Sequence, residues 1–586
     1  MKKRTIGTLL AALLMAGGAV AQNNGGIDAA MYKEISESYK PTTSEKALQN
    51  ILMGNPIKAL SLNQENLGEM NTHFSHSVPS KGITNQESSG RCWLFTGMNV
   101  MRAKMIAEQD LGAFQFSQVY NFFFDQLEKS NLFLQGIIDT RKKPKEDRVV
   151  DWLFKNPLSD GGTYTGVADL VAKYGIVPKG VMPETYTSNN TDAFNSLLKR
   201  KLREFGLRLR DAADNGAKEK ELLAMKKEQL KVVYKMLAQV YGVPPTEFEW
   251  APKDANGKYR EEPQKYTPKS FYDKYIGIDL QNDFVMLMND PTRPYWKSYE
   301  IEYDRHAYDG HNWLYVNLPI EEIKQMAIAS IKDSTMMYFS CDVGKFLDSK
   351  RGTLDMNNYN YEELFGVEFG MDKRERISVY DSGSSHAMTL KAVDIDKDGN
   401  IVKWQVENSW GAGSGYQGTL IMTDEWFDEY MFRLVVDKKY VPAKVLDVLK
   451  EKPTMLPAWD PMFMPEESEP PTATVADTER TSYRAYCRVL CTGPDEQIYA
   501  HVDYGQKGYR KITSCLADEN GKKIKFDSRM AIINYMSKLG WDLKEIGFNN
   551  QDTDVNDTFL FTKIVASDKE ISDGLHTQAD HKKSKE

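Results

Sequence analysis

Apolar side chains recur at helical spacing after position 92. Met98, Met101, Ile106 and Leu111 belong to this stripe, which predicts helix from residue 92 to about residue 128. Apolar residues at this spacing are far more often core than ligand contacts, so we expect the stripe to be buried.

Residues 190–300 have a second helical pattern with a different composition. Residues 197–203 and 231–235 alternate apolar and basic side chains, and the pattern breaks at Asn215-Gly216. This predicts a helical hairpin with a dense Lys/Arg face. We favour an oligomer contact or a solvated face over a nucleic-acid surface, because pairing with nearby acidic residues accounts for the pattern without a ligand.

Residues 310–440 contain short apolar runs that predict strands. The runs are 313–316, 336–340, 388–393 and 434–436, with a helical pattern at 320–331. Together with the preceding helices they predict an α+β fold.

Beyond Pro461 the chain becomes acidic and rich in proline, which predicts a linker at residues 463–480. A small α+β module is predicted at 481–570, followed by a polar tail at 571–586. The module's strand patterns are 483–490, 498–502, 512–515 and 558–565, and its helical pattern is 530–539.

The first residues have the pattern of a targeting signal. Lys2-Lys3-Arg4 precede an apolar run, and Ala19-Val20-Ala21 fits a small-x-small cleavage site. We interpret residues 1–21 as a cleaved signal peptide of bacterial type, with an uncleaved anchor as the alternative. The mature chain, 22–462 plus the module, is then expected in the periplasm or outside the cell, with no membrane span.

Composition and charge narrow the class of protein. The chain has 586 residues, 41% hydrophobic and 27% charged, with a net charge of −8. This length predicts two or three domains. The negative charge argues against a general nucleic-acid binder, since polyanions are held chiefly by Lys and Arg.

Cys92 is the first candidate for chemistry, because Gly90 and the apolar pattern place it at the beginning of a predicted helix. The exposed N–H groups and partial positive charge there favour the thiolate, which is the nucleophile. Six residues earlier, the amide of Gln86 can donate to the oxygen that becomes negative when a carbonyl is attacked.

Two later motifs supply the partners that such a nucleophile needs. His386 leads into a predicted strand and can accept the thiol proton. Asn408 can fix the tautomer of the imidazole, and Trp410 can shield the pair from water.

The remaining cysteines are Cys341, Cys487, Cys491 and Cys515. Cys487 and Cys491 fall on one face of a predicted strand, and no His or Cys cluster completes a tetrahedral site. We therefore favour core thiols, or a disulfide with Cys515, over a metal site.

These motifs resemble the bleomycin hydrolase and aminopeptidase C branch of the papain-like cysteine peptidases. The resemblance covers roughly residues 30–462, and further matching segments are 116–123, 160–162, 173–179, 340–345, 426–430, 435–442 and 456–461. It implies a two-lobed papain-like fold, in which a helical lobe faces an antiparallel, barrel-like lobe and the active site lies in the cleft between them.

The resemblance also implies a function. Cys92, His386 and Asn408 would form the catalytic triad of a peptidase, and Gln86 would complete the oxyanion hole. Gly161-Gly162 and Trp410 would contact the peptide substrate, a plain turn being the alternative for the glycines. The resemblance further implies no metal or organic cofactor, and a homo-oligomer that is a ring-shaped hexamer.

Three departures from the family pattern matter. Ser89 stands where papain has a second cysteine, and Cys92 and His386 are about 300 residues apart instead of about 130–150, which indicates a large insertion. The chain also continues past Pro461, near which relatives end with a carboxylate in the cleft.

This continuation leaves two alternatives besides an aminopeptidase. The residues around Trp459 can still block the cleft, with Asp460 or another acid holding the substrate's ammonium group, which is the aminopeptidase that we favour. If that block is displaced, the chain is an endopeptidase. A non-catalytic binding protein on a peptidase scaffold is the rival from another class.

Overall fold

The computed structural model describes residues 25–68, 70–463, 483–493, 497–505, 514–518, 520–547, 558–565 and 568–578. The chain divides into two compact units, Met1–Thr472 and Ala473–Glu586. The predicted signal peptide, all of the predicted linker except Phe463, and the end of the polar tail lie outside the described residues. No described helix combines the length and apolar character needed to cross a membrane.

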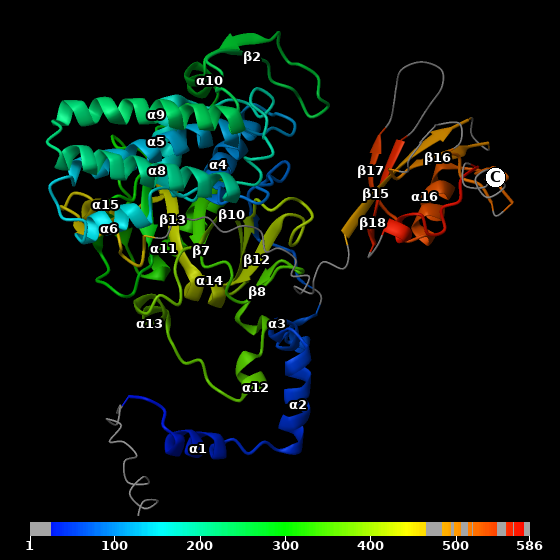
Figure 1. Ribbon diagram of the computed structural model, residues 1–586, viewed down its shortest axis with the longest axis horizontal. Coiled ribbons are helices and arrows are strands. Elements are labelled where there is room, and N and C mark those ends of the chain that lie inside the picture. Colours follow the sequence, from blue (N-terminus) through cyan, green and yellow to red (C-terminus); the bar gives the residue numbers. More distant parts are fainter. Residues whose placement is uncertain are drawn as a thin grey trace, which may run out of the picture. The chain divides into compact units, whose positions relative to one another are not determined.

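Helices gather on one side of the first unit (Figure 1). They are α4 (Cys92–Glu108), α5 (Gln118–Asp139), α6 (Arg148–Lys155), α7 (Tyr164–Tyr174), α8 (Asp192–Asp214), α9 (Glu219–Tyr241) and α10 (Pro268–Tyr275). The long helix α5 packs against α7, α8 and α9. A short ribbon, β2 (Phe248–Trp250) with β3 (Gln264–Tyr266), lies between α9 and α10 in sequence.

The prediction of one continuous helix from 92 to 128 is wrong in its middle. The chain leaves α4 at Glu108 because Asp110 adopts a left-handed backbone with φ of 44°. At Gly112, a Cβ atom would lie 2.6 Å from the carbonyl oxygen of Asp254, so the backbone passes too close there for any side chain. A new helix then begins behind Ser117, whose hydroxyl accepts the backbone N–H of Tyr120.

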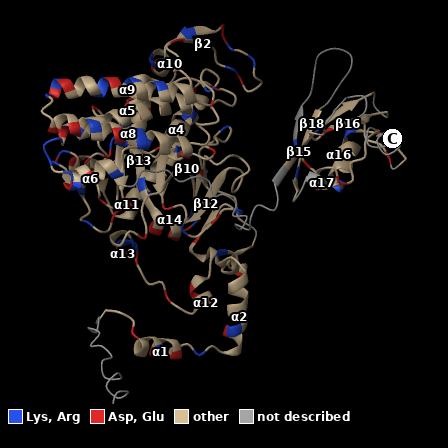
Figure 2. Ribbon diagram, in the orientation of Figure 1, with Lys and Arg blue, Asp and Glu red and all other residues tan. Residues whose placement is uncertain are grey.

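The predicted helical hairpin is present as α8 and α9. Figure 2 shows acidic and basic residues interspersed along both helices. Several of the cations bond within the chain: Arg203 donates to the carbonyl oxygen of Phe154 at 2.8 Å, and Arg210 to that of Lys143 at 2.6 Å. This use of the basic side chains supports a structural or solvated face.

Twelve strands of the first unit form one sheet. They are β1 (His76–Ser77), β4 (Phe284–Met288), β5 (Lys297–Ile301), β6 (Leu314–Asn317), β7 (Met337–Cys341), β8 (Leu347–Asp348), β9 (Thr353–Leu354), β10 (His386–Ile395), β11 (Ile401–Glu407), β12 (Thr419–Thr423), β13 (Met431–Asp437) and β14 (Thr454–Leu456). The order is β14-β5-β6-β4-β13-β7-β10-β11-β12-β9-β8, with β1 beside β10. The central neighbours from β4 to β12 pair antiparallel.

Four further helices connect or cover these strands. They are α11 (Ile320–Lys332), α12 (Tyr361–Phe365), α13 (Lys373–Ser378) and α14 (Asp424–Tyr430). A fifth helix, α15 (Ala443–Val448), lies between β13 and β14 in sequence. The predicted helix at 320–331 and the predicted strands at 313–316, 336–340, 388–393 and 434–436 are confirmed, with bounds that differ by at most three residues.

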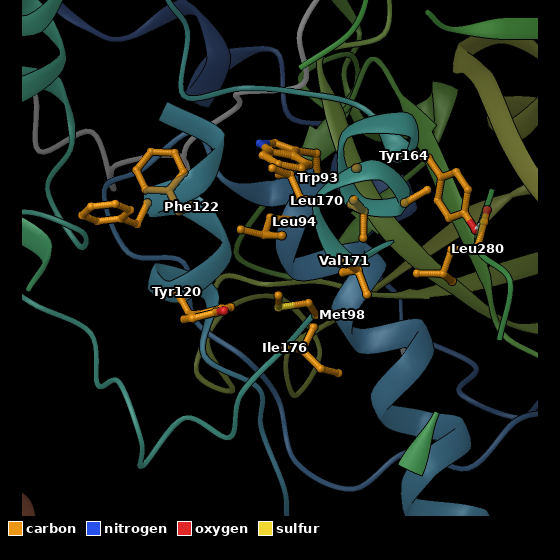
Figure 3. Packing of buried hydrophobic residues seen from close by; sticks show 14 of the residues in the cluster. Trp93, Leu94, Met98, Tyr120, Phe122, Tyr164, Leu170, Val171, Ile176 and Leu280 are labelled. Atoms are coloured by element: carbon orange, nitrogen blue, oxygen red, sulfur yellow. Dashed lines mark hydrogen bonds between the residues drawn. The ribbon is translucent and has the colours of Figure 1, made fainter. Parts of the chain in front are cut away.

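The residues after Cys92 form part of the core (Figure 3). Trp93, Leu94 and Met98 project from α4 into a cluster that also contains Leu170 and Val171 of α7. The predicted stripe, Met98, Met101, Ile106 and Leu111, belongs to this cluster and is at most 5% exposed, so it is core as predicted. On another side, α4 packs against β10, which joins the helices to the sheet.

The N-terminal helices α1 (Ala29–Ser38), α2 (Thr43–Gly54) and α3 (Ile57–Leu60) contain no buried residue. Large apolar side chains are nevertheless exposed along them, including Met31 at 50%, Tyr39 at 59% and Met53 at 80%. We call this segment, residues 29–60, the N-terminal arm. An apolar surface of this kind is typical of a segment that packs against another molecule.

The second unit is a small α+β module, as its pattern predicts. Its sheet has the order β16-β15-β18-β17, and it carries α16 and α17. The bounds are β15 (Tyr483–Thr492), β16 (Tyr499–Asp503), α16 (Arg529–Lys538), β17 (Asp542–Gly547), β18 (Thr558–Val565) and α17 (Asp568–Ile571). Sequence analysis missed β17, an edge strand whose charged residues hide its strand pattern.

The cysteines of this module were predicted to be either core thiols or partners in a disulfide. Cys487, Cys491 and Cys515 are each at most 1% exposed, and none of the chain's five cysteines, all of which are described, is in a disulfide. The disulfide alternative is therefore wrong, and these are core thiols.

Candidate active site

Cys92 is the first residue of α4, and its side chain is fully buried. The first turn of this helix contains no acidic residue, so no carboxylate on it opposes the positive end of the helix dipole. The neighbouring Arg91 is also buried and is neutralised by Glu184, with 2.7 Å between Nη1 and Oε2. These features favour a thiolate at Cys92 without leaving an unpaired arginine beside it.

Hydrogen bonds of its backbone and side chain hold Gln86 in a fixed orientation. Its backbone N–H donates to the carbonyl oxygen of Ser409 at 2.8 Å, and its Oε1 accepts the Ser409 hydroxyl at 2.7 Å. Its Nε2 donates to the carbonyl oxygen of Ser89 at 2.6 Å. An amide NH₂ can donate twice, so the bond to Ser89 does not by itself exclude a second acceptor.

His386 and Asn408 come from neighbouring antiparallel strands. His386 begins β10, Asn408 follows the last residue of β11, and the pairing of Thr389 with Glu407 brings those strand ends together. The imidazole Nε2 lies 2.9 Å from Oδ1 of Asn408. Because an amide oxygen only accepts, the proton sits on Nε2, and Nδ1 is the nitrogen that can act as a base.

Trp410 covers this histidine. Its ring centroid lies 4.8 Å from that of the His386 imidazole, and its side chain is 6% exposed. The structure therefore places Trp410 where it limits access of water to the His386 to Asn408 bond. Direct contact with a substrate stays a prediction for this residue.

Backbone pairing brings these distant segments together. The N–H of Gly411 donates to the carbonyl oxygen of Thr84 at 3.0 Å, next to the bond between Gln86 and Ser409. A buried ion pair of 2.6 Å between Arg102 of α4 and Glu407 of β11 ties the same two regions. Burial lowers the pKa of Arg102 although Glu407 opposes this. Losing either partner would leave a buried charge, which typically costs about 3–5 kcal/mol.

The predicted substrate loop, Asp160-Gly161-Gly162, is fastened to residues on both sides of Cys92 in sequence. The indole Nε1 of Trp93 donates to the carbonyl oxygen of Asp160 at 2.9 Å, and the N–H of Gly90 donates to its carboxylate at 2.9 Å. The two glycines line a cavity of about 400 Å³, which is in the size range of peptide and small-molecule sites.

Apolar side chains form much of the cavity wall, and the end of the described first unit contributes to it. The wall includes Leu132, Phe133, Trp152, Ala458, Trp459 and Phe463. Asp460 also lies there, but its carboxylate is 3.1 Å from Arg293 and accepts the N–H of Met462. Arg293 also pairs with Asp290, at 2.7 Å, and contact of Asp460 with a substrate's ammonium group stays a prediction.

Sequence analysis did not select His306, which lies behind the substrate loop. Its Nδ1 is 2.5 Å from Oδ1 of Asp125, and its ring packs on that of Trp93. A Cβ atom at Gly162 or Gly166 would lie 2.2 Å from its Cε1. The only sequence signal was this pair of glycines, which leave the space that the imidazole fills.

Within the described residues, no group of three or more His, Cys, Asp or Glu side chains is arranged to hold a metal ion.

Comparisons with known proteins agree with this geometry. The model of the peptidase C1-like family matches residues 26–463. Human bleomycin hydrolase is 43% identical over 400 residues, which is 66% of this chain and 88% of the relative. Aminopeptidase C of Lactobacillus delbrueckii subsp. lactis is 38% identical over 418 residues, 70% of this chain and 92% of the relative.

A solved structure supports a papain-like α+β fold. The crystal structure of PepW from Lactobacillus rhamnosis HN001 matches with a TM-score of 0.71 and 36% identity, covering 75% of this chain and 99% of that one. By the family model and by these relatives, the chain belongs to the peptidase C1-like family.

Proposed function

We propose that this chain is a cysteine aminopeptidase, in which Cys92, His386 and Asn408 form the catalytic triad of a two-lobed fold. The observation that carries the assignment of roles is the 2.9 Å bond between His386 and Asn408, beside the helix that begins at Cys92. Two of the similar proteins are named aminopeptidase C and bleomycin hydrolase, which supports this class of reaction.

The residues act in sequence. His386 takes the proton of Cys92 through Nδ1, and the thiolate attacks the carbonyl carbon of the scissile bond. Gln86 and the backbone N–H of Cys92 donate to the oxyanion; losing one such donor typically lowers kcat by about 10²–10³. His386 then protonates the leaving amine, and water hydrolyses the thioester with His386 as base. Peptides are the substrates, and the steps call on no metal or organic cofactor.

The segment Leu456–Phe463 supports removal of residues from a free amino terminus. We call it the blocking segment. Its beginning extends the sheet through β14, Asp460 pairs with Arg293, and the carbonyl oxygen of Met462 accepts from Nη2 of the fully buried Arg433 at 2.6 Å. Part of the segment also lines the cavity beside Gly161-Gly162. An anchored segment there would limit how much peptide extends beyond the nucleophile.

The test compares one peptide with a free and with an N-acetylated amino terminus. We expect cleavage of the free form, one or a few residues from its amine, and at least about 100-fold slower cleavage of the acetylated form, since an unmet charged contact costs several kcal/mol. Product analysis by mass spectrometry measures both. Internal cuts in both forms would replace the aminopeptidase by the endopeptidase alternative, and no cuts in either would favour the binding protein.

The same proposal includes a homo-oligomer, a hexamer by resemblance, and an exported chain. The exposed apolar side chains of the N-terminal arm support the oligomer. Deleting residues 22–60 should convert the oligomer to smaller species in analytical ultracentrifugation, and an unchanged mass would contradict this.

Export rests on the sequence of residues 1–21 alone, and amino-terminal sequencing that begins at Gln22 would support it. We propose no role for nucleic acid.

A further inference from the structure

Three side chains lie behind the substrate loop and take no part in the proposed chemistry. They are Asp125 and Lys129 of α5, and His306, which lies between β5 and β6 in sequence. The side chains of Asp125 and His306 are 0% and 3% exposed. Nζ of Lys129 lies 3.0 Å from Oδ2 of Asp125, on the other carboxylate oxygen from the one that His306 contacts. We call these residues the loop support.

The support holds two consecutive peptide groups of the loop. Lys129 donates to the carbonyl oxygen of Gly161 at 2.5 Å, and the backbone N–H of Thr163 points to Nε2 of His306 at 3.3 Å. These are the peptide groups on either side of Gly162. Lys129 and His306 share Asp125, so both contacts are made on the same side of the loop.

Because peptide groups are planar and trans, these two contacts fix the directions in which the N–H and C=O of Gly162 point. In a trans peptide the C=O and the N–H point in opposite directions, and no described peptide bond is cis. The N–H of Gly162 must therefore point away from Lys129, and its C=O away from His306. One donor and one acceptor of the same residue are thus aimed at the side opposite the support, as in a residue that exchanges two bonds with an extended partner.

The charge state of His306 is part of this arrangement. To accept from Thr163, Nε2 must carry no proton, so the ring is neutral with its hydrogen on Nδ1, facing Asp125. Burial and the Lys129 cation lower the pKa of His306, although Asp125 opposes them. Burial alone would raise the pKa of Asp125, but Lys129 and His306 outweigh it and hold that pKa below its usual value. The carboxylate therefore stays ionised, and the imidazole stays neutral.

The loop support is packed against Trp93 and against two glycines, which fixes its position. The His306 ring centroid lies 4.6 Å from that of Trp93, the residue after Cys92, and Nζ of Lys129 lies 5.4 Å from the same indole. Gly162 and Gly166 have no side chain that could displace the imidazole. The support is thus in contact with the loop and with the helix that carries the nucleophile.

We propose that His306, with Asp125 and Lys129, is a positioning group that presents the N–H and C=O of Gly162 to the backbone of the peptide substrate. The proposal rests on the proposed peptidase function. The loop support determines where the substrate is held, whereas His386 determines the reactivity of the Cys92 thiol. A displacement of about 1 Å in such a contact can cost 10²-fold in rate.

Two substitutions at His306 test this. His306→Phe keeps a ring against Trp93 but removes the acceptor for Thr163, and it should lower kcat/KM for peptides about 10- to 100-fold. His306→Gln keeps an acceptor and a donor, so its kcat/KM should lie within about fivefold of wild type, since an imperfectly placed uncharged hydrogen bond costs roughly 1 kcal/mol. Circular dichroism checks that each variant is folded.

Iodoacetamide separates placement of the substrate from the nucleophile, because this small reagent needs no Gly162 contact. Its rate of alkylating Cys92 should stay within about twofold of wild type in both variants, since the thiolate depends on local charge. His311→Gln is the matched control: His311 also meets a carboxylate, Asp169 at 2.8 Å, but is 67% exposed. This control should leave kcat/KM unchanged.

Distinct outcomes would overturn the proposal. A folded His306→Phe variant with wild-type kcat/KM would do so, as would Phe and Gln variants that lose activity equally. A parallel loss of alkylation would assign the effect to the nucleophile instead. If the Phe variant does not fold, Lys129→Met removes the donor to Gly161 and should give the same loss of kcat/KM at unchanged alkylation. Failure of the peptidase function itself would appear separately, as hydrolysis that survives loss of Cys92.

Discussion

Replacing Cys92 by alanine should lower kcat for peptide hydrolysis by on the order of 10⁶-fold, because removal of the nucleophile leaves only binding and oxyanion stabilisation. The structure gives this thiol a helix N-terminus and a neutralised arginine as neighbours. A fluorogenic peptide with a free amino terminus measures the rate. The alanine variant should still bind the peptide, which fluorescence anisotropy with a labelled substrate would detect.

A second thiol provides the control for this prediction. Burial raises the pKa of Cys487 to about 12, so its thiolate is scarce at neutral pH. Cys487→Ser should retain peptide hydrolysis, and iodoacetamide should modify Cys92 in preference to Cys487. Hydrolysis that persists in the Cys92→Ala variant, is insensitive to iodoacetamide and is blocked by a metal chelator would reject the mechanism.

Replacing His386 by alanine should cost as much as losing Cys92, since a nucleophile and its base act as a unit. The double variant Cys92→Ala, His386→Ala should then be no slower than either single variant. Effects that multiplied instead would show that the two residues act independently, which contradicts the triad.

Thiol reactivity gives an independent measurement on the His386→Ala variant. An unperturbed cysteine has a pKa near 8.5, so at pH 6 only about one thiol in 300 is a thiolate. Pairing with the imidazole should keep the thiolate dominant at that pH. Alkylation of Cys92 at pH 6 should therefore slow about 100-fold in the variant, and an unchanged rate would show that His386 does not set the charge of Cys92.

Much of the candidate site could be recognised from local sequence. Gly90 and an apolar stripe place Cys92 at a helix start, and His386 stands at the start of a predicted strand, where the structure has it. Each of these inferences needs only residues within one turn or one strand. The helical hairpin and strands β6, β7, β10, β13, β15, β16 and β18 follow for the same reason, because their patterns repeat over a short window.

The errors have physical causes that a short window cannot contain. The break between α4 and α5 depends on the close approach of Asp254 to Gly112. The charged edge strand β17 takes its conformation from pairing with β18.

The sequence by itself therefore determined the class of chemistry, through residue types whose neighbours fix their local conformation. Only the tertiary structure decided which of those residues meet. The 2.9 Å bond from His386 to Asn408, the anchoring of the blocking segment and the support behind Gly162 all join residues far apart in the chain. Such contacts depend on strand register and side-chain packing, which are set when the whole core closes and not by any one segment.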